Sequence, residues 1–409
     1  MKKLLFAVLA AASLGLHADL KEKVFKFMPL QSDLGVISGN GTRSQEAVFT
    51  RESAAFTPDF KRFETNIPRF FNGGLLIENG GKTPERGAWN FLPAGVPFLE
   101  GGKTVKGIHG DALEFSGAKT LKAIPLKTGG AHVFSFYAKG KGNLSLTPLL
   151  NLKSGTAKKL PAAGFPLTAE WQRFHVSFSA GNPAKDADPA LSFGGSFQAE
   201  NVTVGAPMLE GPCIYFQTFS PSTYIPNGAF RAADKLKLPV ITPELGTEGA
   251  FAFVFEPTSQ GWWQALLSAG GGWKPELELS YNVYAPTNTR LTLQFRGKKM
   301  LAQARLALGQ KYHLLVNYTK DGFSLWLDGK KLGEEKAPGA PFTTKDLFLG
   351  SRDIEIKSNG IFRNFAIFKA PLDDAEIKEL FLNADLTKLL PAKEVSLASP
   401  FVCSPSTRG

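Results

Sequence analysis

Short segments rich in β-branched and aromatic residues recur along most of this chain, each bounded by Gly, Pro, Asn or Asp. Such segments predict β-strands, and their close spacing predicts antiparallel sandwiches. The clearest are Ala131–Lys139, Trp171–Ser179, Gly249–Phe255, Arg290–Phe295, Tyr312–Tyr318 and Phe323–Leu327. Helical periodicity is nearly absent, so the sequence favours an all-β fold.

One segment departs from this pattern. Asp373–Phe381 places Ile377, Leu380 and Phe381 on one face at helical spacing, and Asp373 or Asp374 can cap the first turn. The sequence therefore predicts one short C-terminal helix.

At 409 residues the chain exceeds one ordinary domain. Its 42 Gly, 27 Pro and 20% charged residues exclude a coiled coil, a collagen-like rod and an acidic disordered chain. We expect two tandem antiparallel β-sandwiches of the jelly-roll type, joined near residues 226–237. The expected limits are a signal peptide at 1–18, a lead-in at 19–42, sandwiches at 43–228 and 240–385, a linker at 229–239 and a tail at 386–409.

The first eighteen residues have the three-part plan of a secretory signal: Lys2 and Lys3, the apolar run Leu4–Ala12, and small residues toward Ala18. The run is too short to span a bilayer, and no later stretch approaches the ~20 apolar residues of a transmembrane helix. We therefore expect cleavage near Ala18, no integral membrane segment afterwards, and a secreted, periplasmic or cell-surface location in a bacterium.

The formal net charge of +11 comes from 47 basic and 36 acidic residues, and loss of Lys2 and Lys3 lowers it to +9. The basic residues are scattered singly and in pairs, which is typical of a solvated surface. No arginine-rich arm, zinc finger or basic aromatic RNA-binding signature is present, so nucleic acid is not expected as a partner.

The C-terminal half carries a series of motifs in order: Gly249–Phe255, Trp262–Ser268, Tyr312–Tyr318, Leu325–Gly329, Leu347–Gly350, Gly360–Phe368 and Leu372–Ile377. Asp328-Gly329 between two apolar segments predicts a tight hairpin, because Gly accepts a positive φ. The order of these motifs resembles the laminin-G-like, concanavalin A-type lectin/glucanase jelly roll over about residues 240–385. The resemblance implies a β-sandwich.

The N-terminal half carries a second series: Phe49–Ala55, Asn66–Phe70, Gly74–Glu78, Phe134–Lys139, Glu170–Phe174, Val204–Glu210 and Ser222–Pro226. It resembles the jelly-roll module of phage and prophage virion or tail-associated proteins, which is similar to xylanase-associated carbohydrate-binding modules. The resemblance covers roughly residues 43–228. The chain departs from that pattern after Glu78, where Asn79–Glu85 replaces the usual Thr-Asn-Leu run.

Carboxylates with the spacing of a hydrolase site occur twice, at Glu276 and Glu278 and at Asp353 and Glu355. Residues two apart on a strand share a face, and retaining hydrolysis needs two carboxyl groups ~5 to 5.5 Å apart. Laminarinase-type hydrolases, which share the C-terminal fold, add a third acid that neither segment has. No Gly-x-Ser-x-Gly elbow is present either. We therefore expect no enzyme activity.

Aromatic side chains are the candidates for binding, because sugar rings stack on flat indole and phenol rings. Trp262, Trp263 and Trp273 bracket an apolar segment and a Gly-rich loop. The resemblance places a structural aromatic near Trp263, which leaves Trp262 and Trp273 as candidate glycan ligands; otherwise they cover the edges of the core. Trp171, within a matching family motif, is expected in the core.

No cofactor is required by the sequence, and calcium is the one that the resemblance adds. The resemblance implies that Ca²⁺ can bind at the sandwich rim, and Asp346, Asp353 and Asn359 are the candidate oxygen donors in the corresponding stretch of this chain. The five His lack metal-binding spacing, and we expect Cys213 and Cys403, 190 positions apart, to be free thiols.

Three functions follow from these observations. The favoured hypothesis is a secreted, non-catalytic glycan-binding or adhesive protein that recognises a polysaccharide or glycoconjugate through loops and exposed aromatics. The alternatives are a structural or assembly protein of a cell surface or prophage particle that binds other proteins, and a divergent glycoside hydrolase.

Overall fold

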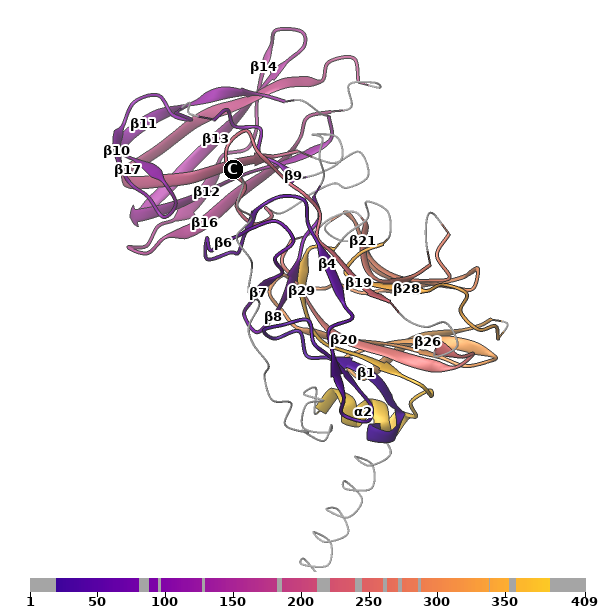
Figure 1. Ribbon diagram of the computed structural model, residues 1–409. Helices are drawn as coiled ribbons and strands as arrows, with labels where there is room; N and C mark the ends of the chain where they lie inside the picture. Colours follow the sequence, from indigo (N-terminus) through magenta and orange to yellow (C-terminus); the bar gives the residue numbers. More distant parts are fainter. Residues whose placement is uncertain are drawn as a thin grey trace, which may run out of the picture.

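The computed structural model describes residues 20–80, 88–94, 97–126, 129–181, 186–211, 221–239, 245–259, 263–270, 274–285, 288–337, 339–352 and 358–382. It consists mostly of antiparallel β-sheets arranged as two bodies (Figure 1). This confirms the expected all-β class. None of the helices among the described residues is long and apolar enough to cross a membrane.

One body is the β10–β17 sandwich, an eight-stranded sheet that folds over itself. Its longest strand, β17, pairs with β11 along one edge; along the other it pairs first with β13 and then with β12. Phe134, Phe136, Phe193 and Phe197 fill its core without any exposed surface. Its strands are β10 (Lys103–Lys106), β11 (Asp111–Pro125), β12 (Ala131–Lys141), β13 (Asn143–Leu152), β14 (Ala157–Lys159), β15 (Ala163–Pro166), β16 (Gln172–Ser179) and β17 (Ala190–Glu210).

The other body, the two-sheet sandwich, packs a ten-stranded sheet against a seven-stranded sheet. Alternate side chains of both sheets form one continuous core, as the period of two in the sequence requires. Its C-terminal strands are β19 (Lys235–Pro239), β20 (Gly249–Pro257), β21 (Trp263–Ala269), β22 (Leu277–Ala285), β23 (Asn288–Phe295), β24 (Lys298–Gln303), β25 (Tyr312–Tyr318), β26 (Gly322–Leu327), β27 (Lys330–Lys336), β28 (Asp346–Leu349) and β29 (Gly360–Phe368).

Two local predictions are confirmed in this body. Asp328 and Gly329 join β26 to β27 with φ values of 49° and 75°, the conformation of a two-residue hairpin turn. Helix α2 (Asp374–Leu382) begins after Asp373, whose Oδ1 accepts from the backbone N–H of Ala375 and Glu376 at 2.9 Å. The Glu376 carboxylate in turn accepts a hydrogen bond of 2.8 Å from the backbone N–H of Asp373, which completes a capping box. Residues 20–23 add a second helical turn that was not expected.

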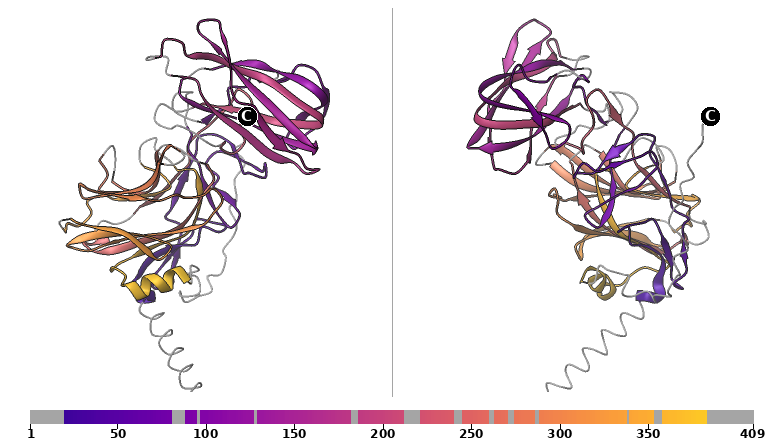
Figure 2. Two further views of the ribbon diagram at one scale, coloured as in Figure 1. Left: turned by 180° about the vertical axis from the view of Figure 1, so that it is seen from behind. Right: turned by 60° about the vertical axis from the view of Figure 1, so that its left-hand side comes forward.

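The strand pairing differs from the expected limits of the sandwiches. Strands β1 and β8 hydrogen-bond to β29, and β4 pairs with β19, so most strands of residues 24–77 extend the sheets of the two-sheet sandwich, while β5 and β6 form a separate hairpin. Figure 2 shows these indigo strands beside the yellow ones. The β10–β17 sandwich therefore interrupts the other body in sequence. The N-terminal strands are β1 (Val24–Met28), β2 (Val36–Ser38), β3 (Arg43–Ser44), β4 (Val48–Thr50), β5 (Ala55–Phe56), β6 (Arg62–Phe63), β7 (Arg69–Phe71) and β8 (Gly74–Ile77).

A small two-stranded sheet lies where the chain crosses between the two sandwiches. Strand β9 (Ala88–Trp89) pairs with β18 (Phe230–Arg231), and Trp89 stacks on Phe230 with ring centroids 5.6 Å apart. The two crossings of the chain between the bodies are therefore held side by side.

Candidate ligand-binding pocket

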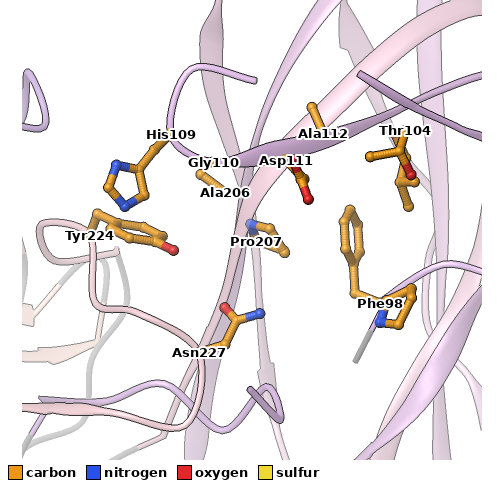
Figure 3. A pocket seen from close by; sticks show the side chains of 12 residues that line it. Phe98, Thr104, His109, Gly110, Asp111, Ala112, Ala206, Pro207, Tyr224 and Asn227 are labelled. Carbon is orange, nitrogen blue, oxygen red and sulfur yellow. The ribbon is translucent and has the colours of Figure 1, made fainter. Parts of the chain in front are cut away.

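A pocket of about 390 Å³ opens at the end of the β10–β17 sandwich that lies near these crossings (Figure 3). Three stretches far apart in the sequence form its walls: the β10–β11 hairpin with the residues before it, the bend in β17, and the loop that precedes β18. The lining residues are Pro97, Phe98, Thr104, His109, Gly110, Asp111, Ala112, Leu113, Ala206, Pro207, Tyr224 and Asn227.

Local backbone geometry directs these residues into the pocket. The hairpin tip closes through a hydrogen bond of 2.8 Å from the N–H of Gly107 to the carbonyl of Gly110, and Gly110 has a φ of 66°. In β17 the ladder with β12 shifts register between Gly205 and Met208, and Ala206 has a φ of 45°. An extra residue of this kind bends a strand and redirects its side chains. The shift thus brings Ala206 and Pro207 to the pocket wall.

Four polar groups face the pocket with unused hydrogen-bonding capacity. Within the part of the chain that the structure describes, nothing pairs with the carboxylate of Asp111 or with the hydroxyls of Thr104 and Tyr224. Asn227 accepts a bond at its Oδ1 from Asn90 at 3.1 Å and keeps its Nδ2 group available. Figure 3 shows the groups of Asp111, Tyr224 and Asn227 turned toward the space around Pro207. They offer donors and acceptors to a polar ligand.

The aromatic wall of the pocket is supported from the other body. The rings of His109 and Tyr224 lie 4.5 Å apart, and Phe60 stacks on His109 at 5.3 Å and contacts Tyr224 at 5.5 Å. Phe56 meets Tyr224 edge-on at 5.6 Å. Burial lowers the pKa of His109 and raises the pKa of Tyr224, so that the imidazole is neutral and the phenol protonated near pH 7.

A buried charge cluster anchors the loop that carries Tyr224. We call Arg51, Arg69, Glu78, Arg231 and Asp234 the junction cluster; none of them is more than 2% exposed. Glu78 accepts at Oε1 from the backbone N–H of Thr223 at 2.9 Å, directly before Tyr224. Burial opposes ionisation of Glu78, yet Arg231 and Arg69 lower its pKa to about 2. Glu78 therefore stays ionised and holds the loop in place.

A second buried acid beside this loop, Glu210, has a raised rather than a lowered pKa. Glu210, at the end of β17, accepts from the N–H of Ser222 at 3.0 Å. Burial raises the pKa of Glu210, although its bond with Ser222 and the charge of Arg173 oppose the shift. Two consecutive loop residues, Ser222 and Thr223, are thus each held by a buried acid.

The glycan candidates named from the sequence, Trp262 and Trp273, lie outside the described residues, as do Cys213 and Cys403. Trp263 is half-buried and donates from Nε1 to Oε1 of Glu278 at 2.8 Å.

The other tryptophans have structural neighbours. Trp171 is half-buried rather than in the core, with the Lys139 ammonium 5.2 Å from its ring. Trp326 is buried against the sheet face that α2 covers. Neither lines the pocket described above.

The two calcium candidates among the described residues, Asp346 and Asn359, lie at opposite ends of β21. Asp346 begins β28 beside the end of β21 at Ala269, and its carboxylate lies 3.4 Å from the Lys237 ammonium. Asn359 lies beyond the opposite end of β21, where its N–H donates to Gln264 and its Oδ1 accepts from the N–H of Asn79. Asp353 falls outside the described residues. Within the described ranges, no three His, Cys, Asp or Glu side chains cluster as a metal site would require.

Of the acids with hydrolase-like spacing, the two described ones, Glu276 and Glu278, are bonded to other protein groups. Glu276 accepts from the N–H and hydroxyl of Thr343 at 2.9 and 2.6 Å. Glu278 is 3% exposed and lies 3.0 Å from the guanidinium of Arg352, which stacks over Trp263. Burial raises the pKa of Glu278, against the influence of Arg352. Asp353 and Glu355, the second pair with this spacing, are not among the described residues.

A larger cavity of about 690 Å³ lies on the ten-stranded sheet beside the start of α2. Several of its polar groups are already bonded. The Asn317 amide makes two bonds with the backbone of Leu372, the Trp326 indole donates to Ser324, and Lys331 pairs with Glu334. This cavity is therefore a weaker candidate than the pocket of Asp111 and Tyr224.

Sequence patterns alone do not predict that pocket. Ser222–Pro226, which contains Tyr224, belongs to the motif series of the N-terminal half, and that resemblance assigns no binding role to Tyr224. The one local signal is the stretch His109–Asp111, which carries a ring and an acid beside Gly110. No periodicity links it to Tyr224 or Asn227, more than a hundred positions later.

Comparison with known protein families finds a match for one part of the chain. Residues 231–378 match the family described as the concanavalin A-like lectin/glucanases superfamily, which confirms the expected laminin-G-like domain. No curated protein sequence matches the chain.

Solved structures resemble parts of the chain at low identity. Domain 4 of AbnA, a GH43 extracellular arabinanase from Geobacillus stearothermophilus, in complex with arabinotriose, has 14% identity and a TM-score of 0.30, over 36% of this chain and 72% of that one. The heptameric SAP-like pentraxin from Limulus polyphemus has 12% identity and a TM-score of 0.30, over 33% and 70%. The ligand-binding domain of botulinum neurotoxin serotype D, in complex with N-acetylneuraminic acid, has 14% identity and a TM-score of 0.30, over 37% and 40%.

Proposed function

We propose that this protein, whose residues 231–378 form a concanavalin A-like lectin/glucanase domain, is a secreted, non-catalytic glycan-binding protein. The sugar lies in the pocket of Asp111, Tyr224 and Asn227, in the neighbouring β10–β17 sandwich. Trp262 and Trp273 of the lectin-like domain remain candidates for a second contact. The leader-like segment 1–18 supports export.

One observation carries this proposal. Unpaired donors and acceptors of Asp111, Thr104 and Asn227 line a pocket that Tyr224 and His109 border with aromatic rings. Sugars combine apolar C–H faces with many hydroxyls, so a ring beside uncommitted polar groups suits them. A volume of about 390 Å³ is adequate for one or two sugar rings.

The same lining supports binding without catalysis. Asp111 is the one carboxylate among the described lining residues. Glycoside hydrolysis ordinarily uses two carboxyl groups on either side of the scissile bond. A lone carboxylate is better suited to accept hydrogen bonds from sugar hydroxyls.

A glycan array with the purified protein tests the proposal, followed by calorimetry with the best ligand. Tyr224→Phe removes one hydroxyl and Thr104→Val another, and each is expected to weaken binding about fivefold, or ~1 kcal/mol. Thr203→Val is the matched control, because Thr203 lies in β17 and does not line the pocket. Thermal melting confirms that each variant is folded.

Two outcomes would count against the proposal. If the folded protein binds no glycan on the array, the proposed glycan-binding function is wrong. Binding that survives Tyr224→Phe combined with Thr104→Val places the sugar elsewhere, with Trp262 and Trp273 as the next residues to change.

A further inference from the structure

The pocket has a charge opposite to that of the whole chain. Asp111 is the one acidic side chain among its described lining residues, and no lysine or arginine lines it. His109 adds no positive charge near neutral pH, because burial lowers its pKa. The full sequence, in contrast, carries a formal net charge of +11.

We propose that this pocket selects sugars with a protonated amino group, in which Asp111 accepts the ammonium, and that it excludes acidic sugars. The inference rests on the glycan-binding function proposed above and names the class of sugar for the same site. Selection follows from the local lining rather than from net charge, since salt at physiological strength screens exposed charges beyond ~8 Å.

The carboxylate of Asp111 is available for this role. No hydrogen bond or ion pair engages it in the part of the chain that the structure describes. Lys106 is its cross-strand partner in the β10–β11 ladder but does not line the pocket, and no ion pair joins the two side chains. Asp111 is exposed at the start of β11, and a carboxylate that lacks a protein cation is open to a ligand cation.

The aromatic wall favours the same ligand. The rings of Tyr224 and His109 lie 4.5 Å apart on one side of the pocket. A cation that approaches the face of a tyrosine ring gains further attraction from the ring quadrupole. A uronate or sialate carboxyl group would instead meet Asp111 and be repelled, because the described lining residues include no lysine or arginine to receive it.

The test compares three defined probes by calorimetry at pH 7 in 0.15 M salt: a glucosamine trimer, its fully N-acetylated counterpart and a galacturonate trimer. We expect the glucosamine trimer to bind about fivefold or more tightly than the N-acetylated one, and the galacturonate trimer to give no measurable binding. Asp111→Asn should abolish the preference while it retains binding of the N-acetylated trimer.

Glu114→Gln is the matched control. It removes one negative charge from the same strand, but Glu114 is three residues from Asp111 and faces the other side of the sheet, opposite Lys103. We expect the preference for the amino sugar to survive this change. If Glu114→Gln reduces the preference as much as Asp111→Asn does, the general field of the protein is responsible and the inference fails.

The outcomes separate the two proposals. Binding of the N-acetylated or another neutral glycan, with no preference for the amine or with tighter binding of galacturonate, overturns the charge selection and leaves glycan binding intact. Absence of binding by every probe and every array glycan, in a folded sample, overturns both.

Discussion

The guanidinium of Arg69 and the carboxylate of Asp234, 165 positions apart in the sequence, form an ion pair in which neither side chain is exposed. Asp234 also accepts from the backbone N–H of Glu78 at 2.9 Å and lies 3.2 Å from the guanidinium of Arg51. The junction cluster thus ties strands of the N-terminal segment to the chain that leaves the β10–β17 sandwich. The pocket loop is attached to the same cluster through Glu78 and Thr223.

Arg69→Met should destabilise the protein by about 3 to 5 kcal/mol, because it leaves Asp234 and Glu78 buried with less compensation. Chemical denaturation followed by tryptophan fluorescence measures the effect. Arg62→Met is the control, since Arg62 pairs with Glu64 at the surface and should change stability by less than ~0.5 kcal/mol. Equal losses of unfolding free energy in the two variants would show that the buried Arg69 ion pairs stabilise the protein no more than a surface pair does.

The free energy of unfolding should fall as the pH is lowered, because Glu78 loses its charge by protonation. Its pKa in the folded protein is about 2, below the usual value of 4.5. A carboxylate with a lowered pKa contributes stability that is complete above its unfolded pKa and is lost as the pH falls toward the folded one. We expect about 3 kcal/mol to disappear between pH 5 and roughly pH 2.

Denaturation midpoints across this pH range provide the measurement. In Glu78→Gln the same interval should show a visibly shallower decline, because the titrating group is gone. An unchanged slope would assign the acid sensitivity to other carboxylates.

Phe60→Ala should weaken glycan binding although Phe60 does not line the pocket. Its ring stacks on His109 and contacts Tyr224, so its removal frees both pocket rings to move. We expect a three- to tenfold loss of affinity, equal to roughly 0.7 to 1.4 kcal/mol. Phe63→Ala, in the same hairpin, is the control, because the Phe63 ring contacts Lys61. Equal affinities of the two variants would show that Phe60 does not position the wall.

Asp373→Ala should cost about 1 kcal/mol of stability through loss of the cap of α2, because two N–H groups lose their acceptor. Asp374→Ala, one position later, removes only a favourable charge in the first turn and should cost a few tenths of a kcal/mol. Thermal melting of both variants decides the comparison. A larger effect at Asp374 would contradict the assignment of the cap.

Local structure followed directly from local sequence. The β-branched and aromatic residues of Ala131–Lys139 predicted β12, Asp328-Gly329 predicted the hairpin turn, and Asp373 with its apolar partners predicted α2. Each of these patterns depends on neighbours within a few positions, where strand period, positive φ and capping act without the rest of the molecule.

The candidate site did not follow in this way. Thr104, Asp111, Tyr224 and Asn227 share no motif, and their meeting depends on the hairpin, on the register shift in β17 and on the loop held by Glu78. Pairing between distant segments is decided by burial and hydrogen bonding in three dimensions, which a sequence pattern does not record.

The sequence alone determined that this chain is a β protein with turn-rich connections, a C-terminal helix and a lectin-like half, because hydrophobic period and turn chemistry are local properties. The tertiary structure alone decided that strands β1 to β4, β7 and β8 complete the sheets of the two-sheet sandwich. These strands are two to five residues long, too short to specify a partner before the shared core forms. The same assembly buries the Arg69–Asp234 pair and thereby positions the pocket.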